Sequence, residues 1–274
     1  QAEELGKGRT EFHMVGGLHP DLPFDYYLEM IHGIKEIHPH LHLKCFTSTE
    51  IRWIADHIAK MSIEETLETL VRAGLGSLTG GGAEIFAEPT RSKICKGKQS
   101  AEDWLEVHRI AHNMGLSSTC TMLYGHIETD ADRVDHMLQL RELQDETNGF
   151  TTFIPLSFHP DNTQMSDVRP SGGILDLKNY AVSRLLLDNI PHIKAYWIMV
   201  GLPIAQLSQQ YGVNDLDGTV VQEKIYHMAG AQTPSELTVD YIRNIIREVG
   251  REPVERDTLY NEVIREGEKW AVHA

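Results

Sequence analysis

Apolar segments that end in glycine, histidine or small polar residues recur along this chain, and helical segments separate them. The first contains Phe12, Met14 and Val15 and ends in Gly16-Gly17. Two adjacent glycines let a ligand approach the backbone closely, because neither has a Cβ atom. A tight turn without a ligand is the alternative for one such pair, so the interpretation depends on how the other strands end.

About six strands are predicted from the apolar pattern, and they share this kind of ending. The later ones end in Thr47-Ser48-Thr49-Glu50, in Gly80-Gly81-Gly82-Ala83-Glu84, in Gly125-His126, in His159-Pro160-Asp161-Asn162-Thr163 and in Gly201. Strict alternation of strand and helix predicts parallel pairing with right-handed crossovers. Polar endings on every strand favour a partial, TIM-like (β/α)6 barrel with a ligand at its carboxyl face. A flat doubly wound sheet would concentrate its ligand contacts at one switch point.

The 274 residues, 41% of them hydrophobic, are enough for one large α/β domain. We expect residues 1–201 to form the barrel core and residues 202–274 to form a helical C-terminal extension packed on it. Within that extension the pattern predicts helices over 204–211, 221–228 and 235–249.

Two local patterns predict particular elements. Apolar residues at helical spacing predict a helix from Phe24 to Ile37, and the aromatic segment from Ile193 to Val200 predicts a strand. Thr47 to Glu50 and Ser62 to Glu65 have the spacing of capping boxes, so each is expected to open a helix.

Composition excludes several classes of protein. The formal net charge of −15 argues against a nucleic-acid surface, which needs clustered lysine and arginine. No apolar run approaches the ~18 residues that cross a membrane, and the first ten residues lack the hydrophobic region of a signal peptide. We therefore expect a cytoplasmic protein. Because the chain begins with Gln1 and not with methionine, we also expect it to begin inside a larger protein.

Cysteine and histidine spacing bears on metal binding. Cys45, Cys95 and Cys120 are far apart and form no CxxC pair, which excludes a disulfide framework or a cysteine zinc site within this chain. His40 and His42 share one face of a strand, as in zinc-dependent barrel hydrolases, but they lie at the start of the strand, opposite the expected site. A solvated turn is the alternative for this pair. Asp215 and Asp217 resemble a metal loop only superficially.

Candidate functional residues lie at the strand ends. His19, His126 and His159 could bind carboxylates or transfer protons, because an unperturbed imidazole titrates near neutrality, although each alone could be structural. Glu84 follows three glycines, and such an acid suits a ribose diol or an ammonium group; a capping role is the alternative. Three arginines on predicted helices could bind carboxylates or could be paired on the surface: Arg133, Arg141 and Arg184.

Several long motifs together resemble one family. They are Glu11–Asp25, Lys44–Glu50, Thr121–Glu128, Leu143–Thr147, Phe153–Asn162, Asp188–Trp197 and Asp215–Thr219. In these motifs the chain is similar to the aminofutalosine synthase family of radical S-adenosylmethionine enzymes, over about residues 9 to 261. Sister enzymes, the cyclic dehypoxanthinyl futalosine synthases and the deazaflavin-cofactor synthases, share some of the motifs. The Leu18-His19 pair, the Tyr124-Gly125-His126 run and the Lys194–Trp197 run favour aminofutalosine synthase.

The resemblance implies a reaction in menaquinone biosynthesis. A [4Fe–4S] cluster cleaves S-adenosylmethionine reductively, with an electron from a donor such as flavodoxin or ferredoxin. The deoxyadenosyl radical then adds to 3-[(1-carboxyvinyl)oxy]benzoate, and rearrangement with loss of carbon dioxide gives 6-amino-6-deoxyfutalosine.

The resemblance also implies roles for individual residues. Those expected to bind the cofactor are Gly16, Gly17, Thr47, Ser48 and Glu84. Those expected around the substrate are His126 and His19, as catalytic residues, with Tyr124, His159 and Asn162 as binding residues.

The chain departs from the family in one respect, because it lacks the CxxxCxxC loop that holds the cluster. We expect no metal ligand in this chain, with the cluster cysteines and the first barrel strand upstream, and the fragment alone should be inactive. Three alternatives remain: a radical cyclase acting on dehypoxanthinyl futalosine, a zinc-dependent barrel hydrolase, and a non-catalytic remnant that binds nucleosides.

Overall fold

The computed structural model describes residues 6–220, 225–228, 233–234 and 236–273. The described chain divides into two compact units. Unit 1 comprises Gln1–Gly82, Lys98–Thr119 and Val254–Ala274, and unit 2 comprises Ala83–Gly97 and Cys120–Pro253.

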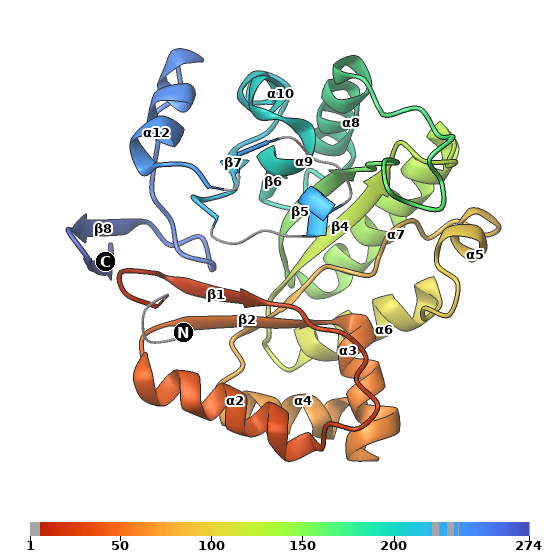
Figure 1. Ribbon diagram of the computed structural model, residues 1–274, viewed down its shortest axis with the longest axis vertical. Coiled ribbons are helices and arrows are strands. Elements are labelled where there is room, and N and C mark those ends of the chain that lie inside the picture. The colour runs from red at the N-terminus through yellow and green to blue at the C-terminus, as the bar shows by residue number, and fades with distance from the viewer. Residues whose placement is uncertain (1–5, 221–224, 229–232, 235, 274) are drawn as a thin grey trace. The chain divides into compact units, whose positions relative to one another are not determined.

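Unit 1 is built on parallel strands in the order β1-β2-β3-β4, of which β1, β2 and β4 are labelled in Figure 1. The strands are β1 (Glu11–Met14), β2 (His42–Thr47), β3 (Ser77–Thr79) and the start of β4 (Ser118–Tyr124). The helices are α2 (Phe24–Ile37), α3 (Ser48–Trp53), the π-helix η1 (Ile54–Ala59), α4 (Ile63–Ala73) and α6 (Ala101–Asn113). In the core, Ile31 of α2, Leu43 of β2 and Leu67 of α4 are completely buried. Burying each such side chain contributes about 1.5–3 kcal/mol.

Unit 2 continues the order as β4-β5-β6-β7. Its further strands are β5 (Phe150–Ser157), β6 (His192–Ala195) and β7 (Asp215–Leu216). Its helices are α5 (Thr90–Ile94), α7 (Asp130–Thr147), α8 (Gly173–Leu186), α9 (Trp197–Val200), α10 (Leu202–Ser208), α11 (Ile225–Met228) and α12 (Val239–Glu248). The pairs β5–β6 and β6–β7 are parallel.

The described strands confirm the α/β alternation, and the parallel sheet has one strand more than the expected six. The additional strand, β7, lies in a segment that reads as a loop in the sequence, beyond residue 201. The division into a core up to residue 201 and an extension stays a prediction. The predicted helices over 221–228 and 235–249 both begin in residues outside the described part of the chain. Of the first, α11 is the described portion, whereas the second begins later than predicted, at Val239, after the non-helical residues 236–238.

Two local predictions were wrong. The expected strand from Ile193 to Val200 ends at Ala195, and its aromatic part forms the short helix α9. The indole of Trp197 donates a hydrogen bond to the carbonyl of Gly218 (3.1 Å), which holds this turn against the segment after β7. The second error concerns the C-terminal residues, where an antiparallel hairpin of β8 (Val263–Glu266) and β9 (Lys269–Val272) was not predicted.

Candidate functional site

Glu50 organises the strand ends of unit 1. Its carboxylate accepts hydrogen bonds from the backbone N–H of Gly16 (2.7 Å) and from the N–H and hydroxyl of Thr47 (2.7 and 2.8 Å). Thr47 in return accepts from the Glu50 N–H, which confirms the predicted capping box at the start of α3. This buried acid therefore joins the glycine pair after β1 to the end of β2.

The predicted cofactor-binding residues of unit 1 differ in their surroundings. A Cβ atom at Gly17 would meet no described atom within 4 Å, whereas one at Gly16 would lie 3.4 Å from Glu50. Ser48 is fully buried, and its hydroxyl accepts from the Gln99 amide (2.5 Å) and donates to the Trp104 carbonyl (3.4 Å). Gly17 is therefore the most accessible of these positions, while Thr47 and Ser48 use their hydroxyls within the fold.

Replacement of Glu50 by glutamine is expected to destabilise unit 1 by about 2 kcal/mol, because a buried carboxylate that accepts several hydrogen bonds loses its charge. Glu65, whose capping box with Ser62 is exposed, provides a matched control. Urea denaturation of Glu50→Gln and Glu65→Gln should show the larger loss for Glu50. Equal losses would mean that the contact with Gly16 contributes nothing.

His19, the predicted catalytic histidine of unit 1, lies exposed after the glycine pair. Its Nδ1 accepts from the Asp21 N–H (3.2 Å), and its carbonyl accepts from the indole of Trp53 (3.4 Å). The second of these contacts fixes the backbone at His19 against the end of α3.

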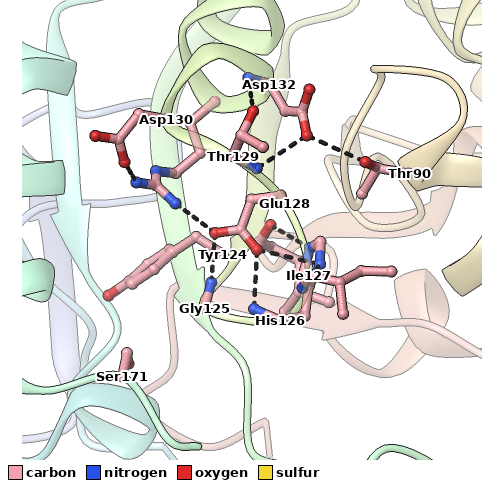
Figure 2. A network of polar contacts seen from close by, with 12 residues as sticks. Thr90, Tyr124, Gly125, His126, Ile127, Glu128, Thr129, Asp130, Asp132 and Ser171 are labelled. Carbon is pink, nitrogen blue, oxygen red and sulfur yellow. Dashed lines mark hydrogen bonds and ion pairs between the residues drawn. The ribbon is translucent and has the colours of Figure 1, made fainter. Parts of the chain in front are cut away.

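In unit 2, the loop between β4 and α7 folds around Glu128 (Figure 2). The Glu128 side chain is 1% exposed. Its carboxylate accepts from the backbone N–H groups of Gly125 (2.7 Å) and His126 (2.9 Å) and from the guanidinium of Arg133 (2.6 Å). The loop is thus wrapped around one buried negative charge, which Arg133 neutralises.

His126 uses both ring nitrogens inside this loop. Nδ1 accepts from the Ile127 N–H (2.7 Å), and Nε2 lies 3.1 Å from the Leu123 carbonyl, to which it donates in the neutral form. Burial lowers the pKa of His126, while the charges of Glu128 and Glu84 oppose this shift. Glu84 is therefore an electrostatic neighbour of His126, and the imidazole is uncharged at neutral pH.

Tyr124 and His159 both interact with Asp176, the first by a hydrogen bond and the second through its charge. Tyr124 is fully buried and donates its hydroxyl to Asp176 (2.8 Å), and Ser171 donates to the same oxygen (3.0 Å). Burial raises the pKa of Tyr124 well above its ordinary value and also raises the pKa of Asp176, an effect that the charge of His159 opposes. The Nε2 atom of His159 lies 2.9 Å from the Met199 carbonyl.

Asn162 is exposed and has a left-handed backbone with φ of 57°. Its side-chain amide donates to the Met228 carbonyl (3.2 Å). The charge of Glu84 therefore acts on His126, and that of His159 acts on Asp176, the acceptor of the Tyr124 hydroxyl, while Asn162 and His19 each lie on an exposed segment.

Three residues that organise these groups were not predicted as site residues: Glu50, Glu128 and Asp176. Glu50 and Glu128 each lie within one of the family motifs, and that was the available signal. The three candidate arginines are paired with their own chain: Arg133 with Glu128, Arg141 with Asp188, and Arg184 with the carbonyl of Gly212.

The cysteines do not form a cluster site. Cys45, Cys95 and Cys120 are buried, reduced thiols, and Cys120 donates to the Thr152 carbonyl (3.5 Å). Burial and the charge of Glu50 raise the pKa of Cys45 to about 12. Among the residues that the structure describes, no three histidine, cysteine, aspartate or glutamate side chains are grouped to hold a metal ion.

The other candidate metal residues have partners within the fold. His42 lies 2.9 Å from the Ser77 hydroxyl, and burial lowers its pKa. The ammonium group of Lys194 lies 3.6 Å from Asp215 and 3.0 Å from Asp217, where a bound cation would otherwise balance the two carboxylates. In the described part of the chain, no helix is both long and apolar enough to cross a membrane.

Comparison with known proteins matches two family descriptions. Residues 1–140 match the radical SAM superfamily, and residues 147–267 match the CofH/MqnC C-terminal region. The chain is 50% identical to the aminodeoxyfutalosine synthase of Thermus thermophilus, over 95% of this chain and 71% of that protein. It is 47% identical to the aminodeoxyfutalosine synthase of Streptomyces coelicolor, over 96% and 70% respectively.

A solved structure supports the fold class. Methylornithine synthase superposes with a TM-score of 0.65 at 17% sequence identity, covering 93% of this chain and 72% of that one. The predicted α/β partial barrel is thereby confirmed.

Proposed function

Because the chain belongs to the aminodeoxyfutalosine synthase family of the radical SAM superfamily, we propose that it adds the deoxyadenosyl group of S-adenosylmethionine to 3-[(1-carboxyvinyl)oxy]benzoate. Rearrangement and loss of carbon dioxide give 6-amino-6-deoxyfutalosine, a precursor of menaquinone. The adenosyl group becomes part of the product, so S-adenosylmethionine is consumed as a substrate.

The observation that carries this proposal is the extent of the likeness to the two aminodeoxyfutalosine synthases. It covers 95% and 96% of the chain at 50% and 47% identity. Proteins with many unrelated activities share the barrel fold, so the residues at the strand ends, and not the fold, determine the function.

Membership of the superfamily implies S-adenosylmethionine and a [4Fe–4S] cluster in general terms. The three cysteines of this chain do not fit the cluster, because they are buried on separate elements and the thiol of Cys120 is already hydrogen bonded. We therefore assign no residue of this chain to the cluster. A flavodoxin or ferredoxin is the proposed electron donor.

The donors and acceptors present fit S-adenosylmethionine better. Glu84 supplies a carboxylate suited to a ribose diol or an ammonium group, and the backbone at Gly17 is open to a ligand. We assign Gly16 and Gly17 to the methionyl end. Thr47, Ser48 and Glu84 are assigned to the ribose and the methionyl end. To bind the ligand, the hydroxyls of Thr47 and Ser48 would each replace a hydrogen bond within the fold by one to S-adenosylmethionine.

The substrate carries two carboxylates, and a few placed donors in an otherwise dry site would orient it. We assign this role to His126, His19, Tyr124, His159 and Asn162, of which His126 and Tyr124 would replace a hydrogen bond within the fold by one to the substrate. Neutral His126 is the proposed group next to the reacting atoms, because it lies beside Glu84 on the adjoining strand end.

Substrate choice separates this function from that of the sister cyclase. The anaerobic holoenzyme would be supplied separately with the aryl enol ether and with dehypoxanthinyl futalosine, and the loss of each would be followed by chromatography. The proposal predicts consumption of the enol ether alone. Consumption of dehypoxanthinyl futalosine would identify a cyclase.

Replacement of Glu84 by glutamine is expected to weaken S-adenosylmethionine binding about tenfold or more, because an acceptor for a diol or an ammonium group loses its charge. Calorimetry on the anaerobic holoenzyme measures this, and Glu88→Gln, an exposed acid in the same loop, is the control. Unchanged affinity in a folded Glu84→Gln protein would remove Glu84 from the cofactor site.

A further inference from the structure

The backbone around Glu84 is held in an unfavourable conformation. Glu84 has a φ of 49°, in the left-handed region that residues other than glycine rarely adopt. Such a conformation is unfavourable, and it persists only where the surrounding structure determines it. The contacts that hold it, described below, lie within unit 2.

Three consecutive carbonyl groups are fixed at this point. Arg91, which is 2% exposed and lies on α5, donates from one guanidinium nitrogen to the carbonyls of Ala83 (2.5 Å) and Ile85 (3.0 Å). The carbonyl between them, that of Glu84, accepts from the Leu123 N–H on β4 (2.7 Å). The peptide groups on both sides of the Glu84 side chain are therefore anchored.

His136 of α7 fixes the next peptide group. It is fully buried; its Nδ1 accepts from the Phe86 N–H (3.2 Å), and its Nε2 lies 2.9 Å from the Thr121 carbonyl of β4. Its ring also stacks on Phe86, with 3.9 Å between ring centroids. Only the neutral tautomer that is protonated on Nε2 makes both hydrogen bonds. Burial lowers the pKa of His136 to about 3, so the ring is neutral near pH 7.

We propose that Arg91 and His136 are positioning residues, which clamp residues 83–86 to β4 and thereby aim the Glu84 carboxylate at S-adenosylmethionine. This inference rests on the proposed cofactor role of Glu84. The chemistry supports a directing role, because a buried guanidinium carries a desolvation cost that an apolar side chain of similar volume would avoid. Here that costly group fixes the carbonyls of Ala83 and Ile85, one on each side of a strained acid whose own carbonyl is held by β4.

A matched pair of substitutions at His136 tests the clamp. His136→Phe keeps an aromatic ring against Phe86 but loses both hydrogen bonds, whereas His136→Gln retains one donor and one acceptor. Arg91→Met removes the two carbonyl contacts, and Ser92→Ala, at an exposed position of the same helix, is the control. The affinities of the anaerobic holoenzyme for S-adenosylmethionine and for the aryl enol ether would be measured by calorimetry, and folding would be checked by urea denaturation.

The expected result is about a tenfold weaker affinity for S-adenosylmethionine in His136→Phe and Arg91→Met, with the affinity for the enol ether changed less than twofold. His136→Gln should restore most of the loss. In the Glu84→Gln background, His136→Phe should cause less than a twofold further change, because the clamp then has no carboxylate to aim.

Two outcomes would overturn the proposal in different ways. If Glu84→Gln weakens binding but the folded His136 variants bind normally, or if the His136 effect persists in full without the Glu84 carboxylate, the clamp is only structural. If Glu84→Gln itself leaves affinity unchanged, the cofactor role of Glu84 fails and the positioning role fails with it. Should Arg91→Met not fold, the His136 pair alone decides.

Discussion

Replacement of Glu128 by alanine is expected to lower the free energy of unfolding by about 3 kcal/mol. Arg133 is 7% exposed, and truncating Glu128 removes its closest buried partner, which is strongly destabilising for a buried ion pair. Asp130 remains near Arg133 and limits the loss. The same change releases the backbone N–H groups of Gly125 and His126, so the loop that carries His126 should lose its conformation.

Urea denaturation measures this effect, with Glu142→Ala as the control on the exposed face of α7. Surface substitutions of that kind usually change stability by less than about 0.5 kcal/mol. Turnover of the enol ether should also fall in Glu128→Ala. A stability loss no larger than that of Glu142→Ala would contradict the central place of Glu128 in the loop.

Lowering the pH from 7 to 5 is expected to cost about 2 kcal/mol of stability for each of two buried histidines, His112 and His136. Burial lowers the pKa of His112 to about 4 and that of His136 to about 3. In the unfolded chain both rings titrate near 6.5, so below that pH the unfolded state binds the proton first and is stabilised. The contribution is complete above pH 6.5 and is lost as the pH falls toward the folded-state pKa.

Urea denaturation at the two pH values measures this loss, and the His136→Gln protein isolates one histidine. Glutamine does not titrate, so the difference between pH 7 and pH 5 should shrink by about 2 kcal/mol in that variant. An unchanged difference would show that His136 is not buried in its neutral form.

Local sequence patterns predicted the elements whose stability is mainly local. The helix from Phe24 to Ile37 has the predicted bounds, and the capping boxes of α3 and α4 form as their spacing indicates. These features depend on residues three or four positions apart, which the sequence displays directly. The segment from Ile193 to Val200 was misread because a short apolar run does not distinguish a strand from a buried helix.

The C-terminal hairpin shows a signal that was present but not used. Gly267, with a φ of 63°, lies in the turn between β8 and β9, and each of these short strands contains apolar residues. Arg265 donates to the Gly8 carbonyl (2.7 Å), and Trp270 donates to the Arg9 carbonyl (3.1 Å). These partners lie more than 250 positions away in the chain. The local sequence pattern, which was read as a helical extension, therefore does not show the contacts that stabilise the hairpin.

The candidate site was predictable as a set of strand ends but not as a set of contacts. The pattern located Gly17, Glu84 and His126 because glycine and polar residues follow apolar segments. The residues that hold them in place act across the fold: His136 is 50 positions from Phe86 in the sequence. Nothing in the periodicity of α7 distinguishes that histidine from the other polar residues of a charged helix.

The fate of the adenosyl group tests the proposed function most directly. The anaerobic holoenzyme would be incubated with reductant, the aryl enol ether and S-adenosylmethionine labelled with ¹³C in its ribose, and the products would be identified by mass spectrometry. The account predicts that the label enters aminofutalosine in an amount equal to the methionine released. Recovery of the label as free 5′-deoxyadenosine would contradict it.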